Sequence, residues 1–144
     1  MGNVRKAVAQ EDAMGCGIAC VAYVCGLSYR TAKQGIFEKP QYAGTKGYAC
    51  RDLVRALAKA DNSFGWSSIK HDIAIPISSI VFTARSEQYP AGHYLVKTRM
   101  GWMDPWINYP RLKAVRGGFR KRLPGRAAYL VYPKMSIEGE NKRR

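Results

Sequence analysis

Residues 9–26, "AQEDAMGCGIACVAYVCG", combine a long apolar run with three of the four cysteines of the chain. Residues 17–25 are apolar on nearly every side of a helix, a pattern typical of a helix buried in a core. Gly26 is a natural stop, because glycine readily adopts the left-handed conformation that ends many helices. The stretch therefore predicts a buried helix that begins close to Cys16 and ends at Gly26.

The four cysteines are best interpreted as reduced thiols. Four in 144 residues are too few for a disulfide-built scaffold, and two of them lie four positions apart on one helix face, a poor place for a bridge. The residues considered as zinc ligands are Cys16, Cys20, Cys25, Cys50, His71 and His93. Their spacing lacks the paired C-x2-C pattern of zinc sites, and no phosphate loop or dinucleotide fingerprint is present. We therefore expect no metal and no cofactor.

Two more helices are expected in the first half of the chain. Ser28 can cap a helix over residues 28–37. A loop over residues 38–48 follows, and then an apolar stripe with charges opposite it in "ACRDLVRALAKA", residues 49–60, predicts an amphipathic helix. The first 60 residues are therefore expected to be helical.

The second half of the chain has the pattern of strands. β-Branched residues dominate residues 73–84, and residues 93–97 and 102–106 predict a hairpin with a short turn at Gly101. Residues 125–133 predict a last strand. Helices followed by antiparallel strands predict an α+β fold, with N-terminal helices packed on a C-terminal antiparallel sheet. The expected boundaries are one domain over residues 1–135 and a basic, disordered tail over residues 136–144.

Cys16 has the surroundings of a nucleophile. It stands between Gly15 and Gly17 at the expected helix start, where free N–H groups and the positive end of the helix dipole favour a thiolate. Glycine on both sides lets a substrate backbone approach closely. Gln10 can place its side-chain amide beside the same helix end and, with the Cys16 N–H, stabilise an oxyanion. The segment therefore predicts a catalytic thiol with an oxyanion hole.

A cysteine nucleophile also needs a base and a group that orients this base. His93 and Asp104 are 11 positions apart in the sequence. If they lie near opposite ends of one tight hairpin, imidazole and carboxylate come within reach of a hydrogen bond, and a slip of one residue in register would separate them. The residues expected to line the substrate groove are Gly15, Gly17, Gly92 and Trp102.

Four short motifs occur in a defined order: Gln10, "CGIAC" at residues 16–20, "GHY" at residues 92–94 and "DP" at residues 104–105. Together they resemble the papain-like cysteine peptidases of the C39 type, which remove double-glycine leaders from bacteriocin and quorum peptides. The stretch "GTKGYACRDLVRALAKA", residues 44–60, resembles the second motif of that family.

The resemblance implies a papain-like cysteine peptidase fold and specific roles for the four residues. Cys16 would be the nucleophile, His93 the general base, Asp104 the orienting group and Gln10 the oxyanion donor. The implied activity is hydrolysis of a peptide or amide bond, with a leader peptide or a glycine-rich site as the substrate.

The chain departs from the family pattern in three respects. Gly15 stands where the family usually has Asp, and the spacing from His93 to Asp104 is shorter than usual, which requires a tight hairpin. No membrane or nucleotide-binding domains follow, so we expect a free-standing relative rather than the peptidase part of an exporter. A deamidase, a transferase or a toxin can use the same triad, so the sequence leaves open which group accepts the acyl group from Cys16.

The charge of the chain is strongly positive. The formal net charge is +14, and residues 111–144 contain 11 basic and two acidic residues. Such a patch attracts nucleic acid, acidic protein or anionic lipid. One alternative is therefore a nucleic-acid-binding protein on a papain-like shell, and another is a peptidase whose basic face recruits an acidic protein substrate. The residues expected to contact nucleic acid or an acidic partner are Arg116, Arg120, Lys121, Arg122 and Arg126.

The N-terminal residues "MGNVRKAVAQEDAMG" lack the apolar segment of a secretory signal. No stretch of the sequence approaches the roughly 20 apolar residues of a transmembrane segment. We therefore expect a cytoplasmic protein that meets peptide or protein substrates there. Export by another machinery stays open.

Overall fold

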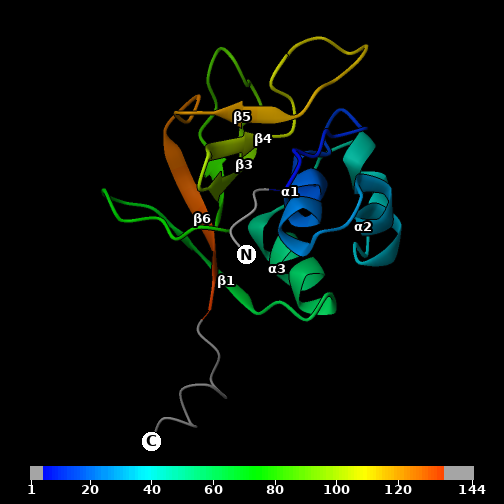
Figure 1. Ribbon diagram of the computed structural model, residues 1–144, viewed down its shortest axis with the longest axis horizontal. Helices are drawn as coiled ribbons and strands as arrows, with labels where there is room; N and C mark the ends of the chain where they lie inside the picture. Colours follow the sequence, from blue (N-terminus) through cyan, green and yellow to red (C-terminus); the bar gives the residue numbers. More distant parts are fainter. Residues whose placement is uncertain (1–4, 135–144) are drawn as a thin grey trace, which may run out of the picture.

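The computed structural model describes residues 5–134 of the 144-residue chain, and the tail expected at residues 136–144 lies outside them. Helices come first in this part of the chain and strands follow, so the fold is α+β as predicted (Figure 1). The elements are α1 (Cys16–Cys25), α2 (Tyr29–Gly35), the 3-10 helix η1 (Pro40–Gly44), α3 (Cys50–Lys59), β1 (Phe64–Ser68), β2 (Ile80–Thr83), β3 (His93–Thr98), β4 (Gly101–Asp104), β5 (Gly118–Arg120) and β6 (Ala127–Pro133).

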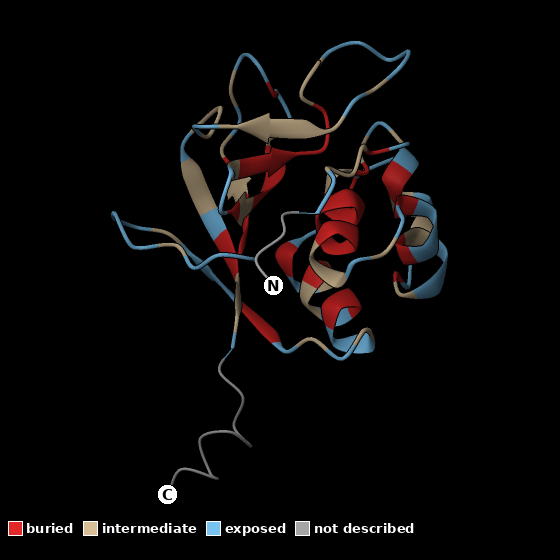
Figure 2. Ribbon diagram, viewed as in Figure 1, coloured by how far each residue is buried: buried red, intermediate tan, exposed pale blue. Residues whose placement is uncertain are grey.

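Helix α1 is the most enclosed element of the helical half. It packs against α2, α3 and β3, and its residues from Gly17 to Tyr23 are all buried (Figure 2). Gly26 ends the helix in the left-handed conformation, with φ at 71°, and its N–H donates to the Tyr23 carbonyl at 3.3 Å. The buried helix predicted by the apolar run is therefore confirmed.

The other two α-helices begin at side chains that cap them. The Ser28 hydroxyl accepts a hydrogen bond from the Thr31 N–H at 3.1 Å and starts α2, as predicted. In α3 the Asp52 carboxylate accepts the Ala49 N–H at 2.8 Å. Helix α3 buries Leu53 and its apolar neighbours and contacts strands β1 and β6. The predicted amphipathic helix is confirmed, and it ties the helical half to the sheet.

The sheet has six strands in the order β1-β6-β2-β3-β4-β5, and every neighbouring pair is antiparallel. The helices cover one face of the sheet, and the other face carries a second apolar cluster covered by loop residues (Figure 2). Alternate residues along each strand point to these two faces. The second cluster is built on Val81, Leu95, Trp102 and Leu130.

Strands β3 and β4 form the predicted tight hairpin. Thr98 pairs with Gly101 and Val96 pairs with Met103, so only two residues make the turn. Gly101 has φ at 102°, and a side chain there would meet the main chain of Arg120 on the neighbouring strand β5. This register places the start of β3 and the end of β4 at the same end of the hairpin.

Candidate active site

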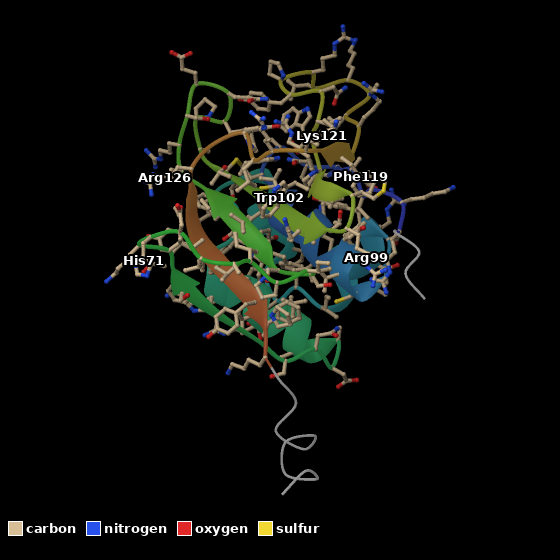
Figure 3. All side chains as sticks on the ribbon, turned by 60° about the vertical axis from the view of Figure 1, so that its left-hand side comes forward. His71, Arg99, Trp102, Phe119, Lys121 and Arg126 are labelled. Carbon is tan, nitrogen blue, oxygen red and sulfur yellow. The ribbon has the colours of Figure 1, made fainter. Side chains whose placement is uncertain are left out.

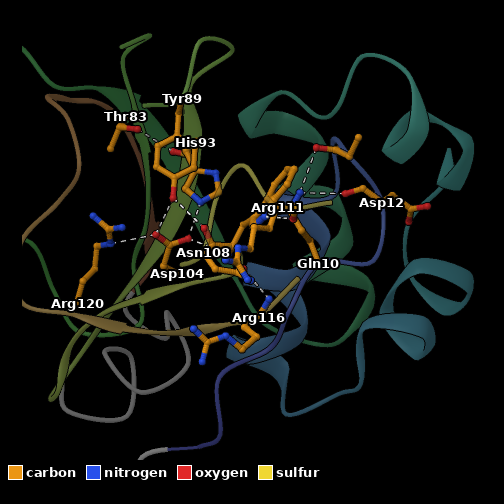
Figure 4. Close-up of polar contacts among 12 residues, drawn as sticks. Gln10, Asp12, Thr83, Tyr89, His93, Asp104, Asn108, Arg111, Arg116 and Arg120 are labelled. Carbon is orange, nitrogen blue, oxygen red and sulfur yellow. Dashed lines mark hydrogen bonds and ion pairs between the residues drawn. The ribbon is translucent and has the colours of Figure 1, made fainter. Parts of the chain in front are cut away.

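Three of the four residues with predicted catalytic roles line one pocket of about 230 Å³, between the start of α1 and the open end of the β3–β4 hairpin. Its wall comes from the segment before α1, the loop before β3 and the segment after β4 (Figure 4). A larger pocket of about 470 Å³ beside the start of α3 has no cysteine or histidine in its lining. The lining residues of the smaller pocket are Gln10, Ala13, Met14, Cys16, Tyr89, Pro90, Ala91, Gly92, His93, Trp106 and Tyr109.

Cys16 is the first residue of α1, and its side chain is half-buried in the pocket wall. The preceding Gly15 has no side chain to cap the helix, so the N–H groups of the first turn lack a side-chain acceptor. All four cysteines are free, and burial raises the pKa of the Cys20 thiol well above its ordinary value. Burial also raises the pKa values of Cys25 and Cys50. Cys16 is therefore the thiol that combines exposure with a helix N-terminus.

His93 and Asp104 form a buried pair at the end of the hairpin. The His93 Nε2 lies 2.7 Å from the Asp104 Oδ1, and the two residues are 3% and 0% exposed. Because Nε2 is held by the carboxylate, Nδ1 is the ring nitrogen left for Cys16. Burial lowers the pKa of His93, but the interactions with Asp104 and Cys16 outweigh burial and raise it to about 9. The pair can therefore hold a proton close to the thiol.

Asp104 is fully buried, and both of its carboxylate oxygens have partners. Oδ1 also accepts the Trp106 N–H at 2.9 Å, and Oδ2 accepts the Tyr89 hydroxyl at 3.1 Å. Burial raises the pKa of Asp104, but the hydrogen bond and charge of His93, together with the other partners, lower it below its ordinary value. The carboxylate is therefore kept ionised inside the protein.

Tyr89 and Arg120 support the pair, and neither role was predicted from the sequence. The Tyr89 ring stacks on the His93 ring, with centroids 3.9 Å apart and planes within 3°. Arg120 Nε lies 3.0 Å from Asp104 Oδ2 as an ion pair, although its buried N–H has no hydrogen-bond acceptor in the described residues. Tyr89 precedes His93 in a loop and Arg120 lies within a basic run, so no spacing rule points to either residue.

Gln10 lies in the pocket wall, but its amide is already engaged. Its backbone N–H donates to the Pro105 carbonyl at 3.1 Å, which fixes it beside the end of β4. Its Nε2 donates to the carbonyls of Asp12 at 2.9 Å and Ala13 at 3.1 Å. Its Oε1 is buried without a partner in the described part of the chain. An oxyanion can therefore receive an N–H from Gln10 only if one of these two bonds is released.

Among the four residues expected to line the substrate groove, Gly92 lines the pocket. Gly92 has φ at 81°, and a side chain there would collide with the ring of Phe82. A side chain at Gly15 would collide with the hydroxyl of Tyr29, and one at Gly17 would press against Leu53. Gly15 and Gly17 are therefore explained by close packing around α1, whether or not a substrate approaches them.

Trp102 lies away from the pocket. It is 7% exposed in the second apolar cluster, and the Lys97 ammonium lies 5.1 Å from the centre of its ring (Figure 3). The aromatic wall of the pocket comes instead from Tyr89, Trp106 and Tyr109, whose rings pack together at centroid distances of 4.7 and 4.8 Å. The expectation for Trp102 is corrected because β4 ends before the chain reaches the pocket.

The expectation that Arg120 is free to contact nucleic acid or an acidic partner is also corrected, because this side chain is paired with the buried Asp104. Arg116, Lys121, Arg122 and Arg126 are exposed. Figure 3 shows Lys121 and Arg126 at well-separated places on the molecule. Lys121 and Arg126 therefore do not lie side by side.

Comparison of the chain with family models, curated proteins and solved structures finds no match. Over residues 5–134, no helix is long and apolar enough to cross a membrane. In the same part of the chain, no three His, Cys, Asp or Glu side chains gather as metal ligands would.

Proposed function

We propose that this protein is a cysteine-dependent peptide or amide hydrolase of the papain-like, C39-related type. The observation that carries the proposal is the position of His93, which is hydrogen-bonded to the buried Asp104 and shares a pocket with Cys16 at the start of α1. A nucleophile, a base and a group that orients the base are the three parts that acyl transfer needs. The split into an N-terminal helical half and an antiparallel sheet supports the same interpretation.

The first half of the reaction forms a thioester. The Cys16 thiolate, beside the His93 imidazolium, attacks the carbonyl carbon of the scissile amide, and the C=O electron pair moves to oxygen. When the tetrahedral intermediate collapses, the C–N bond breaks and His93 gives its proton to the leaving amine. Asp104 keeps the imidazole oriented throughout and stabilises its charged form.

The second half restores the enzyme. Neutral His93 takes a proton from water, and the resulting hydroxide attacks the thioester carbonyl. The C–S bond then breaks, which releases a carboxylic acid and regenerates the thiolate–imidazolium pair. No cofactor takes part in either half of this scheme.

The oxyanion of both intermediates is stabilised at the N-terminus of α1. The Cys16 N–H is the first donor, since no side chain caps this helix. Gln10 is the second donor and releases its longer bond, 3.1 Å to the Ala13 carbonyl, when substrate binds. Gln10→Glu replaces the N–H donor by a carboxylate oxygen, which also loses the bonds to the Asp12 and Ala13 carbonyls. It is expected to lower kcat at least about 100-fold, because the donor is lost and a negative charge stands beside the oxyanion.

The test is digestion of a synthetic peptide library in water enriched in oxygen-18, followed by mass spectrometry. Hydrolysis at a peptide bond leaves the heavy oxygen on a new C-terminus, deamidation leaves it on a side chain, and transfer to another amine leaves none. The wild-type protein is expected to produce new C-termini, and Cys16→Ser to slow their formation at least about 1000-fold.

Cys25→Ser is the matched control, because Cys25 is also half-buried but lies at the opposite end of α1. This variant is expected to digest the library at the wild-type rate. A library that is cut equally by Cys16→Ser and by the wild-type protein would refute the proposal.

A further inference from the structure

The loop from residue 107 to 116 connects the active-site pocket to strand β5 and carries an unusual concentration of positive charge. No Asp or Glu occurs between Asp104 and Glu138 in the sequence. Within the loop, Arg111, Lys113 and Arg116 are exposed, and none forms an ion pair with another described residue. We call these three side chains the loop cations.

The loop has a defined shape, because Asn108 bonds to its far side twice. The Asn108 Nδ2 donates to the Ala114 carbonyl at 2.9 Å, and its Oδ1 accepts the Arg116 N–H at 2.9 Å. The Ile107 N–H also donates to the Arg116 carbonyl at 2.9 Å. These hydrogen bonds fix the backbone from which the loop cations project, so less conformational entropy is lost when a ligand binds.

The loop is held directly against the pocket. The Trp106 indole N–H donates to the Arg111 carbonyl at 2.9 Å, and Trp106 and Tyr109 both line the pocket. On the other side, a side chain at Gly117 would collide with the backbone of Val8, just before Gln10. In Figure 4 Asn108 and Arg111 are drawn between the His93–Asp104 pair and Gln10, and Arg116 is drawn below them.

Two of the acidic residues close to the pocket form ion pairs. Asp12 pairs with Lys33 at 3.0 Å, and Glu11 lies 3.8 Å from Arg30. The residues that line the pocket include no carboxylate. Glu87, two residues before Tyr89, is exposed and has no ion pair with another described residue. The rim therefore carries three loop cations against this one carboxylate, and its potential is positive on the side of the loop.

We propose that the loop cations select substrates in which acidic residues flank the scissile bond. This inference rests on the proposed function and names the class of substrate that the site takes. A peptide that extends from Cys16 over Trp106 and Tyr109 leaves the pocket along this loop. Asp and Glu side chains at that point would meet three cations that lack partners, whereas Lys and Arg would be repelled.

A nucleic acid is less well matched to this surface. The loop cations lie on one side of a pocket that contains a thiol and an imidazole. The exposed apolar side chain among them is Leu112, 76% exposed, rather than an aromatic ring. Single-stranded nucleic acids are bound by stacking on aromatic side chains as well as by charge. The test therefore includes a nucleic acid as a competitor.

The test uses the full chain with Cys16→Ala, so that no probe is consumed. Two labelled dodecapeptides, one of alternating Ser and Glu and one of alternating Ser and Gln, are titrated and binding is followed by fluorescence anisotropy. The Glu peptide is expected to bind about 10-fold more tightly at low salt, and less so as salt rises. Arg111→Gln, Lys113→Gln and Arg116→Gln combined are expected to remove this preference.

The control removes the same charge far from the pocket, with Lys59→Gln, Lys70→Gln and Lys134→Gln, which are exposed positions at the end of α3, after β1 and after β6. This variant is expected to keep the preference. If both triple variants lose the preference for the Glu peptide equally, the inference is overturned, because the net charge of the protein alone would then attract the peptide. Tighter binding of a thymidine dodecamer, lost with the loop cations, would overturn it in favour of nucleic acid.

Cleavage of the library separates this inference from the proposed function. If the wild-type protein cuts peptides without any preference for nearby Asp and Glu, the inference fails and the proposed function stands. If no peptide is cut but the Glu peptide still binds through the loop cations, the proposed function fails and the loop remains a binding surface for acidic peptides.

Discussion

The ring of Tyr89 lies flat on the ring of His93, with the two centroids 3.9 Å apart and the planes within 3°. The Tyr89 hydroxyl also reaches Asp104 Oδ2 at 3.1 Å and the Trp106 carbonyl at 2.9 Å. One side chain therefore fixes both the plane of the imidazole and the position of the carboxylate that orients it. The geometry of the site depends on this loop residue as much as on the hairpin.

Tyr89→Phe is expected to keep the stacked ring and lose the contact with Asp104. Losing one hydrogen bond to a charged group should lower kcat about 10-fold with little change in KM. Tyr89→Leu also removes the stacked ring and should lower kcat further. Steady-state kinetics on a peptide identified from the library will measure both effects.

The control for Tyr89 is Tyr129→Phe, which removes the hydroxyl of a tyrosine that is 41% exposed on strand β6. This variant should have wild-type kinetics. Equal rates for Tyr89→Phe and the wild-type protein would show that the hydroxyl does not position the triad.

Cys16 is expected to react with iodoacetamide much faster than the other cysteines at neutral pH. Cys20 and Cys50 are buried, and burial raises the pKa values of both thiols and of the Cys25 thiol. Only the thiolate is alkylated, so these three should react slowly. Peptide mapping by mass spectrometry will give the four rates.

His93→Ala should slow the alkylation of Cys16 and leave the rates of the other three cysteines unchanged. The reason is that the imidazolium is the positive charge that stands beside the Cys16 thiolate. A Cys16 that reacts no faster than Cys25, with or without His93, would contradict the proposed ion pair.

The activity should fall on the alkaline side as His93 loses its proton. The pKa of His93 is raised to about 9, against an ordinary value of 6.5, so the imidazolium persists at neutral pH. Asp104→Asn removes the charge that favours the imidazolium, and should move the alkaline limb of kcat/KM to lower pH. An alkaline limb that stays in place in this variant would exclude His93 as its origin.

The stability of the fold should depend on pH through the same pair. Because the pKa of His93 is higher in the folded than in the unfolded chain, its stabilising contribution is complete below pH 6.5 and is lost as pH rises through about 9. Asp104 has a lowered pKa, so its contribution is lost only as pH falls through that lowered value. The melting temperature of His93→Gln, followed over pH 6 to 10, should fall less steeply than that of the wild-type protein.

Arg120→Gln should destabilise the protein, because it leaves Asp104 with one partner fewer in a fully buried position. We expect the free energy of unfolding to fall by about 2 kcal/mol, since the carboxylate keeps its other hydrogen bonds. Arg122→Gln removes an exposed cation two positions away and should change the stability by less than about 0.5 kcal/mol. Urea denaturation will compare the two variants, and equal effects would refute the structural role of Arg120.

The helices and the hairpin could be predicted because local signals specify them. The Gly26 stop and the Ser28 cap each act within one helical turn, and the apolar stripe of α3 lies within a single helix. The pairing of His93 with Asp104 followed from an 11-residue spacing, once the turn at Gly101 was taken to be tight. The local sequence was therefore sufficient to predict a contact between two side chains that belong to the same hairpin.

The rest of the site could not be predicted because its partners come from distant parts of the chain. Arg120 reaches Asp104 through β5, a strand of three residues with no alternating pattern. Strand β1 at Phe64–Ser68 was also missed, since its sequence "FGWSS" is half polar. Trp102 lies within β4 and packs in the second apolar cluster, whereas Trp106 follows the strand and lines the pocket. The sequence alone does not mark where β4 ends between them.

The position of β6 in the sheet has a consequence for biosynthesis. This strand, Ala127–Pro133, lies between β1 and β2, although it follows both of them in the chain. Until β6 has been synthesised, β1 lacks its one partner strand and β2 is paired on one side only. Cys16, His93 and Asp104 have already been translated by then. The sheet can therefore close only after this strand has left the ribosome, so β1 and β2 gain their shared partner late in the synthesis of the domain.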